Sequence, residues 1–242
     1  MHHLQSRIQL TAAFRWAARM GWQSGICNHF SLAVNDSSGP SGILINPQGF
    51  HWSELTASSL LLMNSQGKII DGEGEVEDTA FFIHLSTHNE VPSATCVLHA
   101  HPPYTTAIMC SKPGRIVNCS QDSLRFHGRI AYDDHFGGLA GDKTEGARIA
   151  EALGGKPIML MANHGITVTG PSVAKALDDF YYLELAAKYQ VLANNAGDSL
   201  NILSDEKADR LSPAIQQIDT QTAGHFQSIQ RILDKEEPEY RE

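Results

Sequence analysis

The stretch Val97-Leu98-His99-Ala100-His101-Pro102-Pro103 places two histidines at the end of an apolar run. In an extended strand, side chains two residues apart lie on the same face, so Val97, His99 and His101 share one face and the two imidazoles can converge. The two prolines that follow cannot donate ladder hydrogen bonds. We therefore expect the strand to end there and to leave both histidines at the rim of a sheet.

A second apolar segment repeats this pattern about sixty residues further along the chain. It reads Pro157-Ile158-Met159-Leu160-Met161-Ala162-Asn163-His164-Gly165, so a histidine again closes an apolar run and is followed by glycine. If the two strands lie side by side, His99, His101 and His164 offer three nitrogen ligands to one divalent ion. Three protein ligands with one open position are typical of a catalytic metal site rather than a structural one.

The chain has 242 residues, of which 42% are hydrophobic and 19% are charged. A chain of this length can bury one sizeable core, and the composition is typical of a globular α/β protein. We therefore expect a single domain over residues 1–242. Residues 198–242 are more polar, and with helices expected at 204–211 and 220–234 they form a helical C-terminal extension of that domain.

The net charge of −9 comes without a basic cluster. The sequence therefore predicts binding neither to nucleic acid nor to an anionic membrane surface, and an anionic substrate would need cations placed locally. The four cysteines lack ligand-like spacing, which indicates reduced thiols. No apolar signal segment opens the sequence, and no stretch reaches the roughly 18 apolar residues of a membrane span. A cytoplasmic location is expected.

Hydrophobic periodicity outlines the elements around these two segments. Asp78 is expected to cap a helix that starts at Thr79. That helix carries His84 and His88 on one face, and we expect structural roles for both because no glutamate follows the first, as it does in metalloprotease helices. The other expected helices cover 5–20, 104–110, 144–153 and 172–194, and the other expected strands cover the end of 25–32, 42–46, 60–64, 68–71 and 166–169.

Several short pieces occur in a specific order along the chain: Asn28-His29-Phe30-Ser31, Leu44-Ile45-Asn46-Pro47-Gln48-Gly49, His84, His99-Ala100-His101-Pro102, Phe136-Gly137 and Asn163-His164-Gly165. Their order and spacing resemble the class II aldolase/adducin family over nearly the whole chain. The C-terminal segment from Ile232 to Tyr240 is further similar to an adducin-like bacterial and fungal branch of that family.

This resemblance implies an α/β fold of three layers, α/β/α, with a central and mostly antiparallel sheet. It also implies a homotetramer with active sites at subunit interfaces, and a zinc or manganese ion on His99, His101 and His164. The same resemblance implies that the residues contacting a small-molecule substrate are Asn28, His29, Gln48, Thr79 and Phe136.

The sequence departs from the family pattern where sugar-phosphate aldolases carry Ser-Ser-Glu. Aligning on His84 and His99 puts Asp78-Thr79-Ala80 there, so the family's catalytic acid/base is an alanine. The Ser-Ser pair and a Gly-Asn in the first turn hold the substrate phosphate in those relatives. Asp78-Thr79 and Asn28-His29 stand at these positions here. A negative Asp78 would repel a phosphate, so an unphosphorylated substrate is expected.

A metal alone can polarise a carbonyl or hydroxyl oxygen and stabilise a developing enolate. Decarboxylation needs no base to start carbon–carbon cleavage, so it tolerates the loss of the glutamate better than aldol cleavage does. Glu77 or Asp78, within a helix turn of Ala80, could instead supply a displaced carboxylate. His127 and His135 are further candidate proton donors.

The leading hypothesis is a metal-dependent carbon–carbon lyase, either an aldolase or a decarboxylase. It would act on a small, unphosphorylated, oxygenated substrate, with a carboxylate favoured. One alternative is a non-haem iron oxygenase, since three ligands with open positions also suit iron and dioxygen. The other is a non-catalytic, adducin-like interaction module, against which the three converging histidines argue.

Overall fold

The computed structural model describes residues 1–35, 37, 39, 41–91, 93–136, 138, 143–217 and 219–242. Within those residues, eight strands form one sheet in the order β4-β3-β2-β1-β5-β8-β7-β6. Only β6 and β7 are parallel, and the other described neighbours are antiparallel. The strands are β1 His29–Val34, β2 Gly42–Ile45, β3 Leu61–Met63, β4 Ile69–Asp71, β5 Cys96–Ala100, β6 Ile130–Asp133, β7 Ile158–Met161 and β8 Ile166–Gly170.

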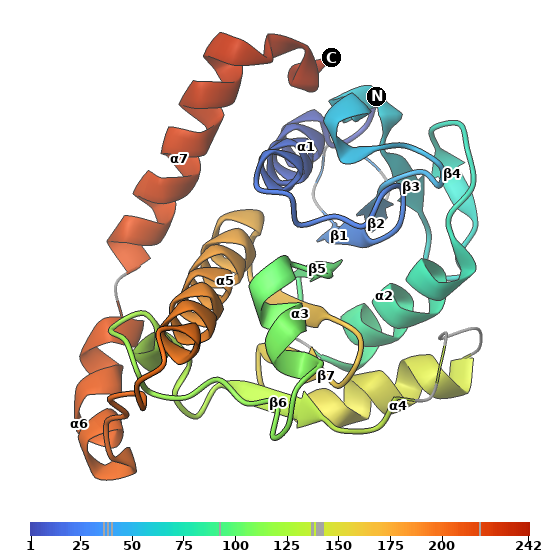
Figure 1. Cartoon of the computed structure of the whole chain (residues 1–242). Helices are drawn as coiled ribbons and strands as arrows, with labels where there is room; N and C mark the ends of the chain where they lie inside the picture. The colour runs from blue at the N-terminus through green and yellow to red at the C-terminus, as the bar shows by residue number, and fades with distance from the viewer. Residues whose placement is uncertain are drawn as a thin grey trace.

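Helices cover both faces of this sheet (Figure 1). Successive side chains along β5 point to opposite faces of the sheet, and both faces are apolar. Leu98 packs into one core cluster with residues of α1 and α5, and Val97 packs into a second cluster with residues of α2 and α4. The expected α/β/α fold with a mostly antiparallel sheet is confirmed. The helices are α1 Leu4–Arg19, α2 Asp78–Glu90, α3 Pro103–Met109, α4 Lys143–Leu153, α5 Val173–Asn195, α6 Asp205–Gln216 and α7 Asp219–Glu236, with short 3-10 helices η1 Trp52–Glu54, η2 Ala57–Ser59, η3 Ser123–Phe126 and η4 Pro238–Arg241.

The two histidine segments are not direct neighbours in the sheet, because β8 lies between β5 and β7. The expectation that these two strands lie side by side is therefore wrong, but the three histidines still come together by a different route. The chain turns from β7 into β8 at residues 162–165, and Ile166 at the start of β8 pairs with Ala100 at the end of β5. His164 therefore comes from a hairpin turn that lies beside the end of β5.

The start of α2 differs by one residue from the sequence expectation. Asp78 is the first helical residue and Glu77 is the N-cap, with no side-chain capping hydrogen bond. The expectation that Asp78 caps the helix is therefore wrong. One consequence bears on the site: Glu77 is extended, and its carboxylate lies beside β1.

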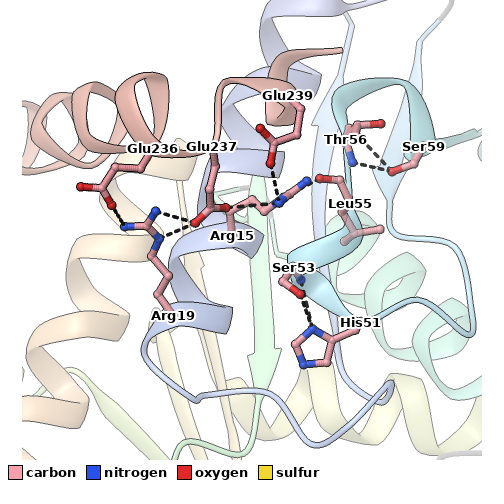
Figure 2. A network of polar contacts seen from close by, with 10 residues as sticks. All are labelled: Arg15, Arg19, His51, Ser53, Leu55, Thr56, Ser59, Glu236, Glu237 and Glu239. Atoms are coloured by element: carbon pink, nitrogen blue, oxygen red, sulfur yellow. Dashed lines mark hydrogen bonds and ion pairs between the residues drawn. The ribbon is translucent and has the colours of Figure 1, made fainter.

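The C-terminal segment is tied to the N-terminal helix by ion pairs. Arg15 pairs with Glu237 and Glu239, and Arg19 pairs with Glu236 and Glu237 (Figure 2). Beyond these pairs, the Tyr240 side chain is fully buried, and the Ser58 N–H donates to the Glu242 carbonyl over 2.7 Å. The segment thus packs on α1 and η2. None of the described helices combines the length and apolar character needed to cross a membrane.

Candidate metal centre

His99 faces the pocket side of β5 with one ring nitrogen already engaged. The side chain is buried, and its Nδ1 lies 3.0 Å from the carbonyl oxygen of Ile166 on β8. A carbonyl only accepts, so Nδ1 carries the proton and Nε2 has a free lone pair. A ligating histidine commonly has this arrangement, because the second hydrogen bond fixes the tautomer and the ring orientation.

His101 lies one residue beyond the end of β5, where Pro102 has stopped the strand. Its Nδ1 lies 3.3 Å from Ser24 Oγ. Its Nε2 is buried and has no hydrogen-bond partner among the residues that the structure describes. A buried nitrogen without a partner is costly, and a metal ion would satisfy it.

His164 completes the group from the turn between β7 and β8. Asn163 precedes it with φ of 55°, the left-handed conformation that Asn tolerates better than most residues, and this turns the chain back toward β5. The ring centroid of His164 lies 5.0 Å from that of His99 and 4.8 Å from that of His101. One nitrogen from each of the three rings lies within 4.8 Å of the other two. The expected cluster of three histidines is therefore present in the fold.

The electrostatics keep these rings in the form that binds metals. Burial lowers the pKa of His99 well below its ordinary value and lowers that of His101 to about 4. Burial also lowers the pKa of His164, while the nearby Asp133 charge acts in the opposite direction. The neutral imidazole is the ligand form, so the donor set fits a divalent ion that accepts nitrogen.

The three histidines open into a pocket of about 220 Å³. Of the described residues that line it, none is a lysine or an arginine. Thr79 and Ile83 of α2 form one wall, and Phe136, whose side chain is 54% exposed, lies at the rim with its ring 6.3 Å from that of His164. The pocket is therefore small and has no cationic side chain among its described lining residues.

His29, His84 and His88 form a second group that the sequence analysis did not foresee as a unit. His29 pairs in register with His99, and the two rings stack at 5.0 Å. Its Nδ1 lies 2.8 Å from His84 Nε2, and Ser31 Oγ joins His84 to His88. The sequence contains a pattern that could have predicted this group. His29 and Ser31 lie two residues apart on one strand face, and His84 and His88 lie four residues apart on one helix face.

The two carboxylates proposed from the sequence, Glu77 and Asp78, differ in their position relative to the pocket. Glu77 Oε2 lies 3.7 Å from His29 Nε2, and Glu77 Oε1 accepts a hydrogen bond from Thr79 Oγ over 2.9 Å. Asp78 is exposed and does not line the pocket. Ala80, aligned with the family's glutamate, is buried in a cluster with Ile45 and Leu61. The pocket-facing residues of α2 are Thr79 and Ile83 instead.

Two of the expected substrate contacts do not line the pocket. Asn28, with φ of 78°, is buried, and its Oδ1 accepts a hydrogen bond from the backbone N–H of Ser24, which also contacts His101. It shapes the turn rather than the pocket surface. Gln48 is exposed in the loop after β2. His29, Thr79 and Phe136 do line the pocket, whereas Gly137, which follows Phe136 in its matching piece, lies outside the described residues.

Neither candidate proton donor lines the pocket. His127 lies in another cavity, where its Nε2 is 2.9 Å from Asp209 and its Nδ1 is 3.1 Å from Asn118. His135 is exposed, and its backbone N–H donates to Asp133. Within one chain, the structure brings neither of them to the three histidines.

Gly165 lies so close to His101 that a substitution at this position would test whether the turn holds the His101 ring in place. A Cβ at this position would lie 2.3 Å from His101 Cδ2 and 2.5 Å from the Ala100 carbonyl oxygen. We expect Gly165→Ala to displace the His101 ring and to weaken metal affinity about 10- to 100-fold, the range typical of lost supporting contacts. Competition with a chelator measures this. Gly224→Ala in α7 is the control, because an added Cβ there meets nothing within 4 Å; equal loss in both variants would contradict the steric explanation.

Comparison with models of known protein families identifies the family of this chain. The model of the class II aldolase and adducin N-terminal domain matches residues 8–191. The chain belongs to this family. It is 30% identical over 244 residues to a Pseudomonas aeruginosa protein provisionally named a class 2 aldolase, covering 98% of this chain and 92% of that protein.

The same family includes relatives with a different name and length. The chain is 34% identical over 216 residues to alpha-adducin of Rattus norvegicus, and the match covers 86% of this chain but 29% of the adducin. Among solved structures, an aldolase II superfamily protein from Pseudomonas syringae superposes with a TM-score of 0.90 at 31% identity, covering 100% of this chain and 96% of that one. An L-fuculose 1-phosphate aldolase from Glaciozyma antarctica gives 0.82 at 27% identity, covering 99% and 92%.

Proposed function

We propose that this class II aldolase family member is a metal-dependent carbon–carbon lyase, an aldolase or a decarboxylase. Its substrate would be small, unphosphorylated and oxygenated, and would carry a carboxylate. The observation that carries the proposal is the group of His99, His101 and His164, in which one nitrogen from each ring lies within 4.8 Å of the other two. The buried Nε2 of His101 has no hydrogen-bond partner among the described residues. A scaffold without chemistry has no need for this group.

His99, His101 and His164 would hold the ion, with zinc or manganese expected. When bound, such an ion polarises a carbonyl or hydroxyl oxygen and stabilises the negative charge that develops as a carbon–carbon bond breaks. The chain itself supplies the rest. Phe136 and Ile83 provide apolar surface for the carbon skeleton, and Glu77 places a carboxylate 3.7 Å from His29 Nε2 at the pocket wall.

The charges around the pocket favour a substrate without a phosphate group. None of the described pocket residues is cationic, and Glu77 adds a negative group at its edge. Asn163 also lines a larger cavity, of about 640 Å³, that includes Lys112 and Arg115. Arg115 is already paired with Asp134, so this cavity suits a single carboxylate better than a dianion.

We further propose the assembly that the family resemblance implies, a cytoplasmic homotetramer with active sites at subunit interfaces, with residues 1–242 as one domain and 198–242 as its C-terminal extension. Phe136 supports the interface position, because a large apolar side chain that is 54% exposed at a pocket rim gains from being covered. Sedimentation velocity of the native protein measures the oligomeric state, and a monomer at micromolar concentration would contradict this part.

One alternative function has a specific observation in its favour. The match to alpha-adducin, at 34% identity, suggests an interaction module without catalysis. Metal analysis separates the alternatives: zinc or manganese without oxygen uptake favours the lyase. Iron with substrate-dependent uptake favours a non-haem oxygenase. Protein that binds no metal after incubation favours the module.

The reaction itself is tested with the metal-loaded protein. We would offer hydroxy acids and hydroxylated aromatic carboxylates and measure released carbon dioxide and aldehyde. Carbon dioxide identifies a decarboxylase, and aldehyde identifies an aldolase. The absence of both products across the set, with metal bound, would contradict the lyase proposal.

Glu77→Gln and Asp78→Asn decide between the two neighbouring carboxylates. We expect Glu77→Gln to lower kcat about 100-fold, as loss of a positioned acid or base does, with metal content unchanged. Asp78→Asn should have little effect, because Asp78 is exposed and outside the pocket. Steady-state kinetics with metal quantification measure both. A larger loss in Asp78→Asn would reverse the assignment.

A further inference from the structure

The helix that follows His101 receives no cap from its own sequence. α3 begins two residues after His101, and Pro102 at the N-cap position makes no side-chain hydrogen bond to the helix. The first N–H groups of a helix have no acceptor within the helix. Pro102 and Pro103 have no N–H, so the first two donors that need an acceptor are the backbone N–H groups of Tyr104 and Thr105.

Glu184 supplies these acceptors from α5, against which α3 packs (Figure 1). Its Oε1 accepts from the Tyr104 N–H over 2.8 Å. Its Oε2 accepts from the Thr105 N–H over 2.8 Å and from the Thr105 hydroxyl over 2.6 Å. The Glu184 side chain is buried, and a buried carboxylate is costly unless donors satisfy it. These hydrogen bonds therefore fix both the carboxylate and the start of α3.

The segment around His101 is short, stiff and held at both ends. Before it, Ala100 ends β5 and is paired in the ladder with β8. After it, Tyr104 is held by Glu184. The two prolines between His101 and Tyr104 have little backbone freedom, because the ring fixes φ, which is −64° at the first of them. The place of His101 is thus set by the sheet on one side and by Glu184 on the other.

We propose that Glu184 is a positioning residue for the metal centre. By holding the start of α3, it sets the place of the His101 ring relative to the rings of His99 and His164. The inference rests on the proposed function, since it assumes that these three histidines hold a metal ion. Glu184 is not among the described residues that line the pocket, so it acts through the backbone of α3 rather than by touching the substrate.

The test exchanges this carboxylate for an amide and measures the binding of Co²⁺ to the full chain. Competition with a chelator gives the affinity, and visible absorption reports the ligand geometry of the bound ion. Glu184→Gln keeps the size of the side chain but has one acceptor oxygen, so its NH₂ group would face an N–H donor. We expect the affinity to fall about tenfold, the lower end of the range for lost supporting contacts, and the absorption band to shift.

Asp178→Asn is the matched control, because Asp178 is a second buried carboxylate on α5 that faces α7 instead of α3. Asp178 accepts from Thr222 Oγ1 over 3.0 Å and from His225 Nδ1 over 2.8 Å. We expect both variants to lower the free energy of unfolding. Asp178→Asn should nevertheless keep the Co²⁺ affinity and the absorption spectrum of the native protein, which separates positioning from a loss of stability alone.

Native affinity and spectrum in Glu184→Gln would overturn the inference and leave the proposed function intact. Equal losses of affinity in the two variants would also overturn it, because general destabilisation would then explain both. A native protein that binds no Co²⁺ would contradict the proposed function and the inference together. If Glu184→Gln does not fold, Thr105→Val removes only the hydroxyl contact and should still lower the affinity; an unchanged affinity in that variant would overturn the inference.

Discussion

Replacing His101 with alanine is expected to abolish metal binding and activity together while leaving the fold intact. His101 Nε2 is buried without a described partner, and the residue lies beyond the end of β5, so the sheet loses no ladder hydrogen bond. Two remaining histidines bind a divalent ion much more weakly than three. We expect metal affinity to fall by more than about 100-fold, beyond the effect of losing a supporting contact.

Metal content after dialysis, activity and circular dichroism are measured on the same preparations. His51→Ala is the matched control, because His51 is exposed and bonds only nearby groups at the start of η1. It should keep both metal and activity. Full metal occupancy in His101→Ala would remove the ligand assignment on which the proposed function depends.

The largest expected loss of stability follows from replacing Arg7, whose side chain is 1% exposed. Its guanidinium donates to the carbonyls of Ala57 and Leu60, to the His2 carbonyl over 2.8 Å and to Asp71 over 2.9 Å. Arg7→Met keeps the volume but leaves buried carbonyls without donors. We expect the free energy of unfolding to fall by about 3 kcal/mol, as measured by denaturant titration at fixed protein concentration.

Arg19→Met on the same helix is the control. Arg19 is 28% exposed and pairs with Glu236 and Glu237, which are 52% and 22% exposed, so solvent screens these pairs far more than it screens the contacts of Arg7. Replacement of Arg19 should cost at most about 1 kcal/mol. If the two variants lost the same stability, burial of the Arg7 hydrogen bonds would not be the cause.

The sequence predicted most of the fold because its patterns are local. Alternation in the segment ending at His101 and the prolines after it marked a strand end, and the helices at 5–20 and 172–194 agree with α1 and α5 to within about two residues. Local rules failed where two neighbouring residues compete for one role. Asp78 is a good N-cap by type, yet Glu77 occupies the cap position, and its carboxylate contacts Thr79 and lies 3.7 Å from His29.

The sequence by itself determined which histidines could hold a metal, since residue type, spacing and strand ends are written locally. Only the tertiary structure decided how they meet. In the folded chain, β8 lies between the two histidine-bearing strands, and His164 lies in the hairpin turn between β7 and β8. His127 lies in another cavity, and packing of α2 on the sheet brings His84 into contact with His29. These outcomes depend on strand order and on helix packing between residues far apart in the chain, which no local pattern encodes.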